Sequence, residues 1–296
     1  MLTSFLRKAG DYMIKLGIIS NLSKDITGEY TKKVLHGILE RNMMPLVTPS
    51  VYQLCQLGNI LAESDIYKQS DLILVLGGDG TILHSSRKAA EYQKPLLGIN
   101  LGHLGFLTEA EMVNLPSILD ALAEGSYKID ERMMIEAKVM RGQHILKRAI
   151  ALNDVIVSKG VFGRIIHLNL NINGEFVNYY AADGLLVSSP TGSTAYSLSA
   201  GGPIVDPDME CLLVTPVCPH TLNSRPIITH ASSAIEIEST DKNRDIQVTI
   251  DGQQIVTLAE GDRIIIEKAN QKTHLIRISG YNFYKLLRNK LFSRNV

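Results

Sequence analysis

An apolar strand that runs into glycines and a single carboxylate is the segment of this sequence best suited to chemistry. Residues 72–76 are all apolar and contain no proline, which is typical of a strand buried on both faces of a parallel sheet. The loop that follows consists of Gly77, Gly78, Asp79, Gly80 and Thr81. Glycines allow positive φ and close approach of the backbone to a ligand, and successive N–H groups in such a turn converge on a phosphate. The pattern predicts a phosphate-binding loop or, alternatively, a tight turn whose aspartate caps the next helix.

The composition limits the classes of protein to consider. The 296 residues, 45% of them hydrophobic, suffice for one large domain or two of ordinary size. The 30 basic and 30 acidic side chains disfavour a nucleic-acid partner and a polybasic membrane anchor. No apolar stretch approaches the roughly 20 residues that span a bilayer, and the first residues lack a signal-peptide pattern. Three scattered cysteines, Cys55, Cys211 and Cys218, indicate a reducing compartment. We therefore expect a cytoplasmic protein without nucleic-acid or membrane partners.

Two sequence patterns divide the chain into domains. Residues 1–125 alternate short apolar strands with helical stripes, which predicts an α/β domain with a parallel sheet. Ligands of such sheets bind beyond the carboxyl ends of the strands, where both 77–81 and 100–105 fall. Residues 126–280 alternate apolar with polar positions and contain Asn-Gly and Asp-Gly hairpin turns, which predicts a β-rich antiparallel domain. Residues 281–296 return to helical spacing, and we expect this C-terminal helix to pack back on the first domain.

Four segments, taken together, resemble the NAD kinases, which phosphorylate the 2′-hydroxyl of the adenosine ribose of NAD to form NADP. They are GGDGT at 77–81, NLGHLGFL at 100–107, Asn153–Asp154, and Asp183–Gly184 followed by SPTGSTAYSLSAGGP at 189–203. The first loop is shared with lipid kinases and phosphofructokinases, whereas the last run is far more specific. The resemblance covers nearly the whole chain. It implies a Rossmann-like, phosphofructokinase-like first domain, NAD as acceptor and ATP as donor.

The resemblance implies that Asp79 is the catalytic base that accepts the proton of the ribose hydroxyl. A carboxylate is a weak base toward an alcohol, and phosphoryl transfer is loose, so Asp79 would mainly orient the hydroxyl and take its proton late. No lysine follows the loop, so it is not a Walker motif, and it is not a GxGxxG fingerprint. We therefore expect Mg²⁺ bound mainly through the nucleotide's phosphates, because the sequence has no carboxylate cluster that forms a metal site.

The β-rich domain holds most of the predicted nucleotide-binding residues. Asn153 and Asp154 offer groups that suit an adenine edge or ribose hydroxyls, although a polar step between two strands gives the same pattern. The resemblance implies nucleotide contacts at Asp79, Gly80, Asn153, Asp154, Arg164, Ala181, Asp183, Thr194, Ala195, Tyr196, Ser197, Leu198, Ser199 and Gln253.

Two of these predictions have structural alternatives. Small residues at 194–199 let an adenine approach the backbone while Tyr196 packs against it, but Ser193 or Thr194 could equally cap a helix. Arg164 matches a phosphate contact in the family, yet a surface ion pair would use the same side chain.

Ala181 is a departure from the family pattern, because many relatives carry Arg or Gly at this position. An alanine side chain neither pairs with a phosphate nor forms a hydrogen bond. The sequence therefore does not decide between ATP and inorganic polyphosphate as the phosphate donor, or between NAD and NADH as the acceptor. Relatives are commonly homodimers or homotetramers, and the sequence does not reveal which applies. Two other functions remain open: a diacylglycerol- or sphingosine-type lipid kinase, and a non-catalytic NAD(P)-binding sensor.

Overall fold

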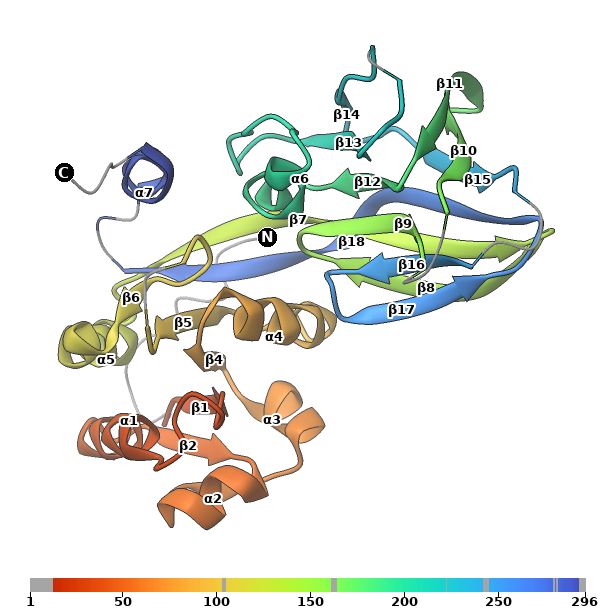
Figure 1. Ribbon diagram of the computed structural model, residues 1–296. Helices are drawn as coiled ribbons and strands as arrows, with labels where there is room; N and C mark the ends of the chain where they lie inside the picture. Colours follow the sequence, from red (N-terminus) through yellow and green to blue (C-terminus); the bar gives the residue numbers. More distant parts are fainter. Residues whose placement is uncertain are drawn as a thin grey trace. The chain divides into compact units, whose positions relative to one another are not determined.

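The computed structural model in Figure 1 describes residues 13–102, 105–160, 164–221, 223–241, 245–278, 280 and 282–292. The chain forms two compact units, residues 1–131 with 273–296, and Arg132–Lys272. It passes between them within two long strands, β7 (Lys128–Arg141) and β18 (Asp262–Arg277), rather than at the predicted positions 125 and 280. In the described part of the chain, no helix combines the length and apolarity required to cross a membrane.

The first unit contains a parallel sheet with the strand order β5-β4-β1-β2-β3. The strands are β1 (Lys15–Ser20), β2 (Met44–Val47), β3 (Asn59–Ile60), β4 (Leu72–Gly77), β5 (Leu96–Asn100) and, beside β5, β6 (Ala110–Glu111). The helices are α1 (Glu29–Glu40), α2 (Pro49–Cys55), α3 (Glu63–Gln69), α4 (Asp79–Glu91) and α5 (Leu115–Glu124), with a 3₁₀ turn at Met112–Asn114. The predicted α/β fold with a parallel sheet is confirmed.

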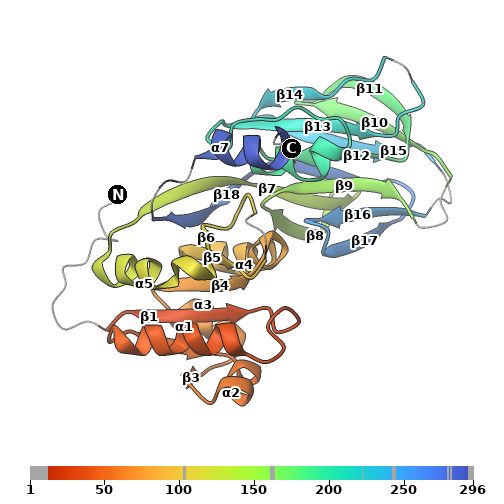
Figure 2. The same ribbon diagram turned by 60° about the vertical axis from the view of Figure 1, so that its left-hand side comes forward.

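Helices cover this sheet because apolar stripes face it. One core cluster joins buried residues of α1, α2 and α5 to β1, β4 and β5, and Figure 2 shows α1 and α5 running alongside these strands. Every residue of β4 is buried, as its uninterrupted apolar run predicts. Ser20 pairs with Leu76, and Gly77 pairs with Asn100. The loops after β1, β4 and β5 therefore emerge side by side at one edge of the sheet.

The second unit is built from antiparallel sheets. One sheet has the order β14-β13-β12-β9-β16-β17, and the other contains β11-β10-β15-β18 with β7 and β8. The strands are β8 (His144–Ala151), β9 (Asp154–Lys159), β10 (Ile166–Ile172), β11 (Glu175–Ala182), β12 (Gly184–Ser188), β13 (Cys211–Val217), β14 (Ile227–His230), β15 (Ile235–Ser239), β16 (Ile246–Ile250) and β17 (Gln254–Leu258). A 3₁₀ turn at Thr191–Thr194 and the short helix α6 (Tyr196–Ser199) follow β12.

Alternating side chains and tight turns explain this β-rich unit. Leu168 and Leu170 of β10 are buried while Asn169 between them is partly exposed, and both leucines join Leu185 and Val157 of the other sheet in one core. The predicted hairpin turns are confirmed, since Asn173–Gly174 and Asp251–Gly252 all have positive φ. The predicted β-rich fold class is thus confirmed as well.

The C-terminal segment forms a shorter helix than expected. Helix α7 (Phe283–Leu287) starts where the Asn282 side chain accepts a hydrogen bond from the Lys285 N–H at 2.9 Å, and a π-helical turn at Arg288–Phe292 follows. The Phe283 ring lies 6.3 Å from the ring of Phe106 within the first unit. Residues 281 and 293–296 of the predicted helix lie outside the described residues.

Candidate active site

The glycine loop joins β4 to α4. Gly77 ends the strand, Gly78 has φ −132°, and Asp79 is the first residue of α4. None of Gly77, Gly78 and Gly80 uses the positive φ that glycine allows. A β-carbon on Gly77 would lie 2.3 Å from Oγ1 of Thr81, so close packing requires glycine there, whereas one on Gly80 would meet no described atom within 4 Å. The backbone at Gly80 is therefore open to a ligand.

The carboxylate of Asp79 binds the second glycine-rich loop. Its Oδ2 accepts a hydrogen bond from the Phe106 N–H at 2.7 Å, and its Oδ1 accepts one from the Leu107 N–H at 3.1 Å. Gly105 permits this approach, because a β-carbon there would lie 1.8 Å from Oδ1 of Asp79. The helix-cap alternative was therefore wrong. A carboxylate has about four lone-pair sites, so two backbone bonds leave acceptor capacity for a substrate hydroxyl.

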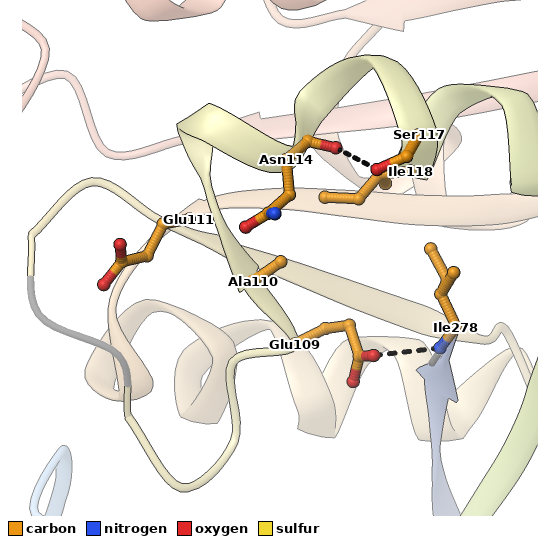
Figure 3. A pocket seen from close by; sticks show the side chains of 7 residues that line it. All are labelled: Glu109, Ala110, Glu111, Asn114, Ser117, Ile118 and Ile278. Atoms are coloured by element: carbon orange, nitrogen blue, oxygen red, sulfur yellow. Dashed lines mark hydrogen bonds between the residues drawn. The ribbon is translucent and has the colours of Figure 1, made fainter. Parts of the chain in front are cut away.

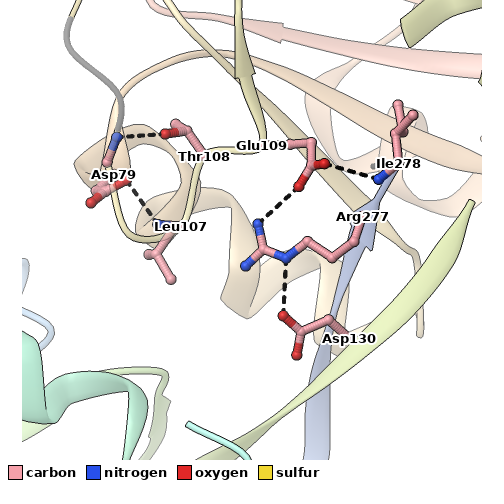
Figure 4. A network of polar contacts seen from close by, with 8 residues as sticks. Asp79, Leu107, Thr108, Glu109, Asp130, Arg277 and Ile278 are labelled. Carbon is pink, nitrogen blue, oxygen red and sulfur yellow. Dashed lines mark hydrogen bonds and ion pairs between the residues drawn. The ribbon is translucent and has the colours of Figure 1, made fainter. Parts of the chain in front are cut away.

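The other end of the second loop is fixed by a buried ion-pair network (Figure 4). Glu109 accepts a hydrogen bond from the Ile278 N–H at 2.9 Å and pairs with Arg277 at 3.3 Å. Arg277 also donates to Asp130 at 3.0 Å. The backbone that holds Asp79 is thus anchored to β18 as well. His103 and Leu104, in the middle of this loop, lie outside the described residues.

Near this network a pocket of about 360 Å³ is lined by Glu109, Glu111, Asn114 and neighbouring residues (Figure 3). None of the predicted site residues lines it. We therefore do not assign it to the reaction.

The loop between β1 and α1 contributes a cation, Lys24, that belongs to no motif of the sequence. A β-carbon on Gly78 would lie 3.1 Å from the Nζ of Lys24. Lys24 precedes its own helix by five residues and lies 55 residues before Asp79, so no motif links it to the glycine loop. The usable indication was its place directly after β1, a strand that neighbours β4 in the sheet.

In the second unit, a buried carboxylate fixes the turn at Asn153–Asp154. Asp251, at the hairpin between β16 and β17, accepts backbone hydrogen bonds at 2.8–3.1 Å from Leu152, Asn153 and Asp154. In the sequence, the Asp-Gly pair at 251–252 predicts only a hairpin turn. The role of Asp251 was hidden because the three donors lie about a hundred residues earlier in the chain.

The TGST segment packs directly on the same turn. The Ser189 hydroxyl donates to the Leu152 carbonyl at 2.5 Å, and the Ser189 N–H donates to the Asn153 carbonyl at 2.9 Å. A β-carbon on Gly192 would lie 2.1 Å from the carbonyl oxygen of Asn153, so only glycine fits there. These contacts bring the predicted residues Asn153 and Asp154 together with the start of the segment 191–199.

The side chains of residues 193–199 divide into structural and exposed groups. Ser193 bonds both backbone groups of Val205, and Ser197 bonds Thr215 at 3.1 Å, so these buried hydroxyls stabilise the loop. Neither Ser193 nor Thr194 caps α6, which corrects the helix-cap alternative. Tyr196 is 45% exposed and free to contact a base. Thr194, Ala195 and Leu198 are half-buried, and Ser199 and Gln253 are exposed.

The remaining predicted residues form a second group. Asp183 pairs with Lys159 at 2.6 Å, and Lys159, Arg164, Ala181 and His220 line an open pocket of about 600 Å³. Strands β9 and β12 pair Asp154 with Ser188 and Ser158 with Gly184. Asp183 therefore lies at the opposite end of this strand pair from Asp154, on the order of 17 Å away at about 3.3 Å per residue. The structure does not bring the two groups together within the unit.

Comparison with known proteins decides the family. Residues 16–127 match the ATP-NAD kinase N-terminal domain, and residues 152–278 match the ATP-NAD kinase C-terminal domain. An NAD kinase of Thermoanaerobacter sp. (strain X514) is 44% identical over 283 residues, covering 95% of this chain and 100% of that protein. The chain belongs to the NAD kinase family.

Solved structures of NAD kinases have the same fold. The structure of yeast NADH kinase complexed with NADH superposes with a TM-score of 0.86 at 28% identity, covering 96% of this chain and 88% of that one. The structure of an NAD kinase from Archaeoglobus fulgidus in complex with ATP superposes with a TM-score of 0.72 at 23% identity, covering 94% of this chain and 98% of that one. This second likeness shows the fold. The protein is thus an NAD kinase, a phosphotransferase that converts NAD to NADP. The lipid-kinase and sensor alternatives find no support.

Asp154 gives this NAD kinase a testable pH dependence. Burial and, to a smaller extent, the negative charge of Asp251 together raise the pKa of Asp154 to about 7. Between about pH 4 and pH 7 the folded state therefore holds a proton that the unfolded chain has released. We expect the free energy of unfolding to fall as pH rises through this window, by up to about 1.4 kcal/mol per pH unit.

Urea unfolding of the wild type and Asp154→Asn between pH 4 and pH 8 measures this effect. The variant should lose most of the slope, whereas Asp208→Asn, at an exposed aspartate of the same unit, should keep it. An unchanged slope in Asp154→Asn would show that Asp154 is not the titrating group.

Proposed function

We propose that this NAD kinase transfers the terminal phosphoryl group of ATP to the 2′-hydroxyl of the adenosine ribose of NAD, with Asp79 as its catalytic residue. The observation that carries the proposal is the Asp79 carboxylate, held by two backbone N–H groups beside the open backbone of Gly80. The 2′-oxygen forms a bond to the γ-phosphorus while the bond from that phosphorus to the β,γ-bridging oxygen breaks. ADP leaves with the electron pair, and Asp79 orients the hydroxyl and takes its proton late.

The glycine loop is proposed to hold the phosphates of the donor through backbone N–H groups. Gly77 ends β4, Gly78 is the N-cap of α4, and Gly80 and Thr81 lie in its first turn, where N–H groups without helical acceptors and the helix dipole favour anions. Mg²⁺ arrives with ATP as the MgATP substrate. Such a cation, bound through phosphates, needs few protein ligands, and the described residues gather no group of three or more metal-ligating side chains.

The second unit is proposed to bind the acceptor. Asn153 and Asp154 hold the adenosine, and the exposed ring of Tyr196 packs on the base. The other proposed contacts in this unit are Arg164, Ala181, Asp183, Thr194, Ala195, Ser197, Leu198, Ser199 and Gln253. Because Asp183 and Arg164 lie at the far end of the β9–β12 pair from Asp154, we propose a homodimer or homotetramer in which they complete the site of a neighbouring copy.

We place the enzyme in the cytoplasm, in keeping with its free cysteines. Cys55 and Cys211 are buried free thiols, and Cys218 is exposed. Such thiols persist in a reducing compartment.

An assay of NADP formation by the purified protein tests the donor and acceptor. We expect kcat/KM for MgATP to be at least about tenfold higher than kcat/KM for inorganic polyphosphate. A binding free energy that favours ATP by about 1.4 kcal/mol is enough for this ratio. NAD and NADH are compared in parallel at equal concentrations, and EDTA should abolish turnover with ATP. NADP formation with polyphosphate but not with MgATP would refute ATP as the donor.

A further inference from the structure

We propose that Lys24, on the loop between β1 and α1, binds the transferring phosphate of the donor and supplies the positive charge that the glycine loop itself lacks. This inference rests on the proposed function, in which the glycine loop holds the donor's phosphates. It concerns a residue outside every motif of the sequence.

The geometry places the Lys24 ammonium over the glycine loop. Its Nζ would lie 3.1 Å from a β-carbon on Gly78, and because Gly78 has none, the ammonium faces bare backbone. The same hypothetical β-carbon is 4.0 Å from Oδ1 of Asn100, at the end of the neighbouring strand β5. Lys24 therefore lies at the edge where the loops of β1, β4 and β5 emerge together.

The backbone of Lys24 is held in place from both sides. Asn21 donates its N–H to the Leu76 carbonyl at 2.9 Å and its side-chain amide to Thr81 Oγ1 at 3.2 Å, which ties this loop to the glycine loop. The Lys24 N–H in turn donates to the Asn21 carbonyl at 3.0 Å. On the other side, Asp25 accepts a hydrogen bond from the Thr31 N–H at 2.8 Å in the first turn of α1. The base of the lysine side chain is thus fixed, and its exposed end is able to follow a ligand.

The charge of Lys24 is not paired within the part of the chain that the structure describes. Among the described residues the Lys24 ammonium forms no ion pair or hydrogen bond, whereas Lys33 pairs with Glu29 at 2.7 Å and Lys88 pairs with Glu63 at 2.6 Å. An unpaired ammonium beside backbone N–H groups at a helix start forms a site for a multiply charged anion. In a kinase that anion is the phosphate chain of the donor.

This position gives the lysine a defined part in the reaction. As the bond from the γ-phosphorus to the bridging oxygen breaks, negative charge builds up on the leaving ADP while the 2′-oxygen bonds to the γ-phosphorus. Lys24 binds the non-bridging oxygens and offsets that charge without exchanging a proton. The lysine of a Walker motif directly follows its glycine loop in sequence. Here the lysine lies on the loop after β1, the strand next to β4 in the sheet.

Steady-state kinetics of Lys24→Gln, Lys24→Arg and the control Lys32→Gln test the proposal. Lys32 is another exposed lysine, on α1, and is not part of the site. We expect Lys24→Gln to lower kcat/KM for MgATP by about 10–10²-fold, less than a buried donor would because Lys24 is solvated. The KM for NAD should stay within about twofold, since the acceptor is held elsewhere. Lys24→Arg should recover most of the loss, and the control should match the wild type.

The outcomes separate a phosphate contact from a structural role. Unchanged kcat/KM in Lys24→Gln, or a loss that Lys24→Arg does not recover, overturns the inference. A rise in the KM for NAD as large as the loss in kcat/KM for MgATP also overturns it, and so does a lower melting temperature. Either result means that the lysine only supports the loop. Failure of the proposed function shows differently, as full activity of Asp79→Asn.

Discussion

Asp79→Asn should lower kcat for NADP formation by about 10²–10⁴-fold, the range expected when a positioned proton acceptor is lost. Asparagine keeps the size of the side chain but cannot take the ribose proton. Its amide nitrogen also faces one of the two N–H groups that Asp79 now binds, so one backbone bond from Phe106 or Leu107 is lost. We expect this change to lower the free energy of unfolding by about 1–3 kcal/mol, leaving the fold intact.

Binding measurements separate the chemical loss from loop displacement. The Kd for NAD, measured by calorimetry on the purified variant, should stay within a few-fold of the wild-type value. Circular dichroism should show the native spectrum. Wild-type turnover in Asp79→Asn would remove Asp79 from the mechanism.

Gly105→Ala should reduce kcat by about 10²-fold although residue 105 has no side chain to take part in chemistry. The new β-carbon would overlap Oδ1 of Asp79, at 1.8 Å, so the carboxylate must move and release the N–H groups of Phe106 and Leu107. A displacement of about 1 Å at a reacting group is enough for such a loss. Overpacking should also cost about 1–3 kcal/mol of stability.

Gly102→Ala is the matched control in the same loop. Among the described atoms, a β-carbon there would meet only Oδ1 of Asn100, at 3.8 Å, which is ordinary contact. Its stability should change by no more than about 0.5 kcal/mol. In addition, Asp79→Ala should cancel most of the stability cost of Gly105→Ala, because it removes the atoms that clash. Additive costs in this double mutant would place the strain elsewhere.

The elements of the fold followed from local patterns in the sequence. The uninterrupted apolar run of β4 predicted a strand buried on both faces, and the alternation in β10 predicted one with a single buried face. The Asn-Gly and Asp-Gly pairs fixed two hairpins, because their backbones tolerate the positive φ that these turns require. The lengths of β7 and β18, which carry the chain between the units, were not foreseen, since no turn residues mark a boundary inside a strand.

The site was predictable only where its residues are contiguous in sequence. The motifs named Asp79, Asn153 and the segment 194–199, but the roles of Asp251, Gly105 and Lys24 stayed hidden. Each acts on a residue at least 26 positions away, through a bond or a close approach that exists only in the folded chain.

From the order of its residues alone, this chain determined its strands, its turns and its membership of a kinase family, because those depend on neighbours in sequence. Tertiary structure decided which backbone groups surround Asp79, which carboxylate fixes Asn153, and where a lysine faces the glycine loop. The physical reason is that a hydrogen bond or a steric overlap depends on distance in space, and sheet pairing alone brings such separate loops to one edge.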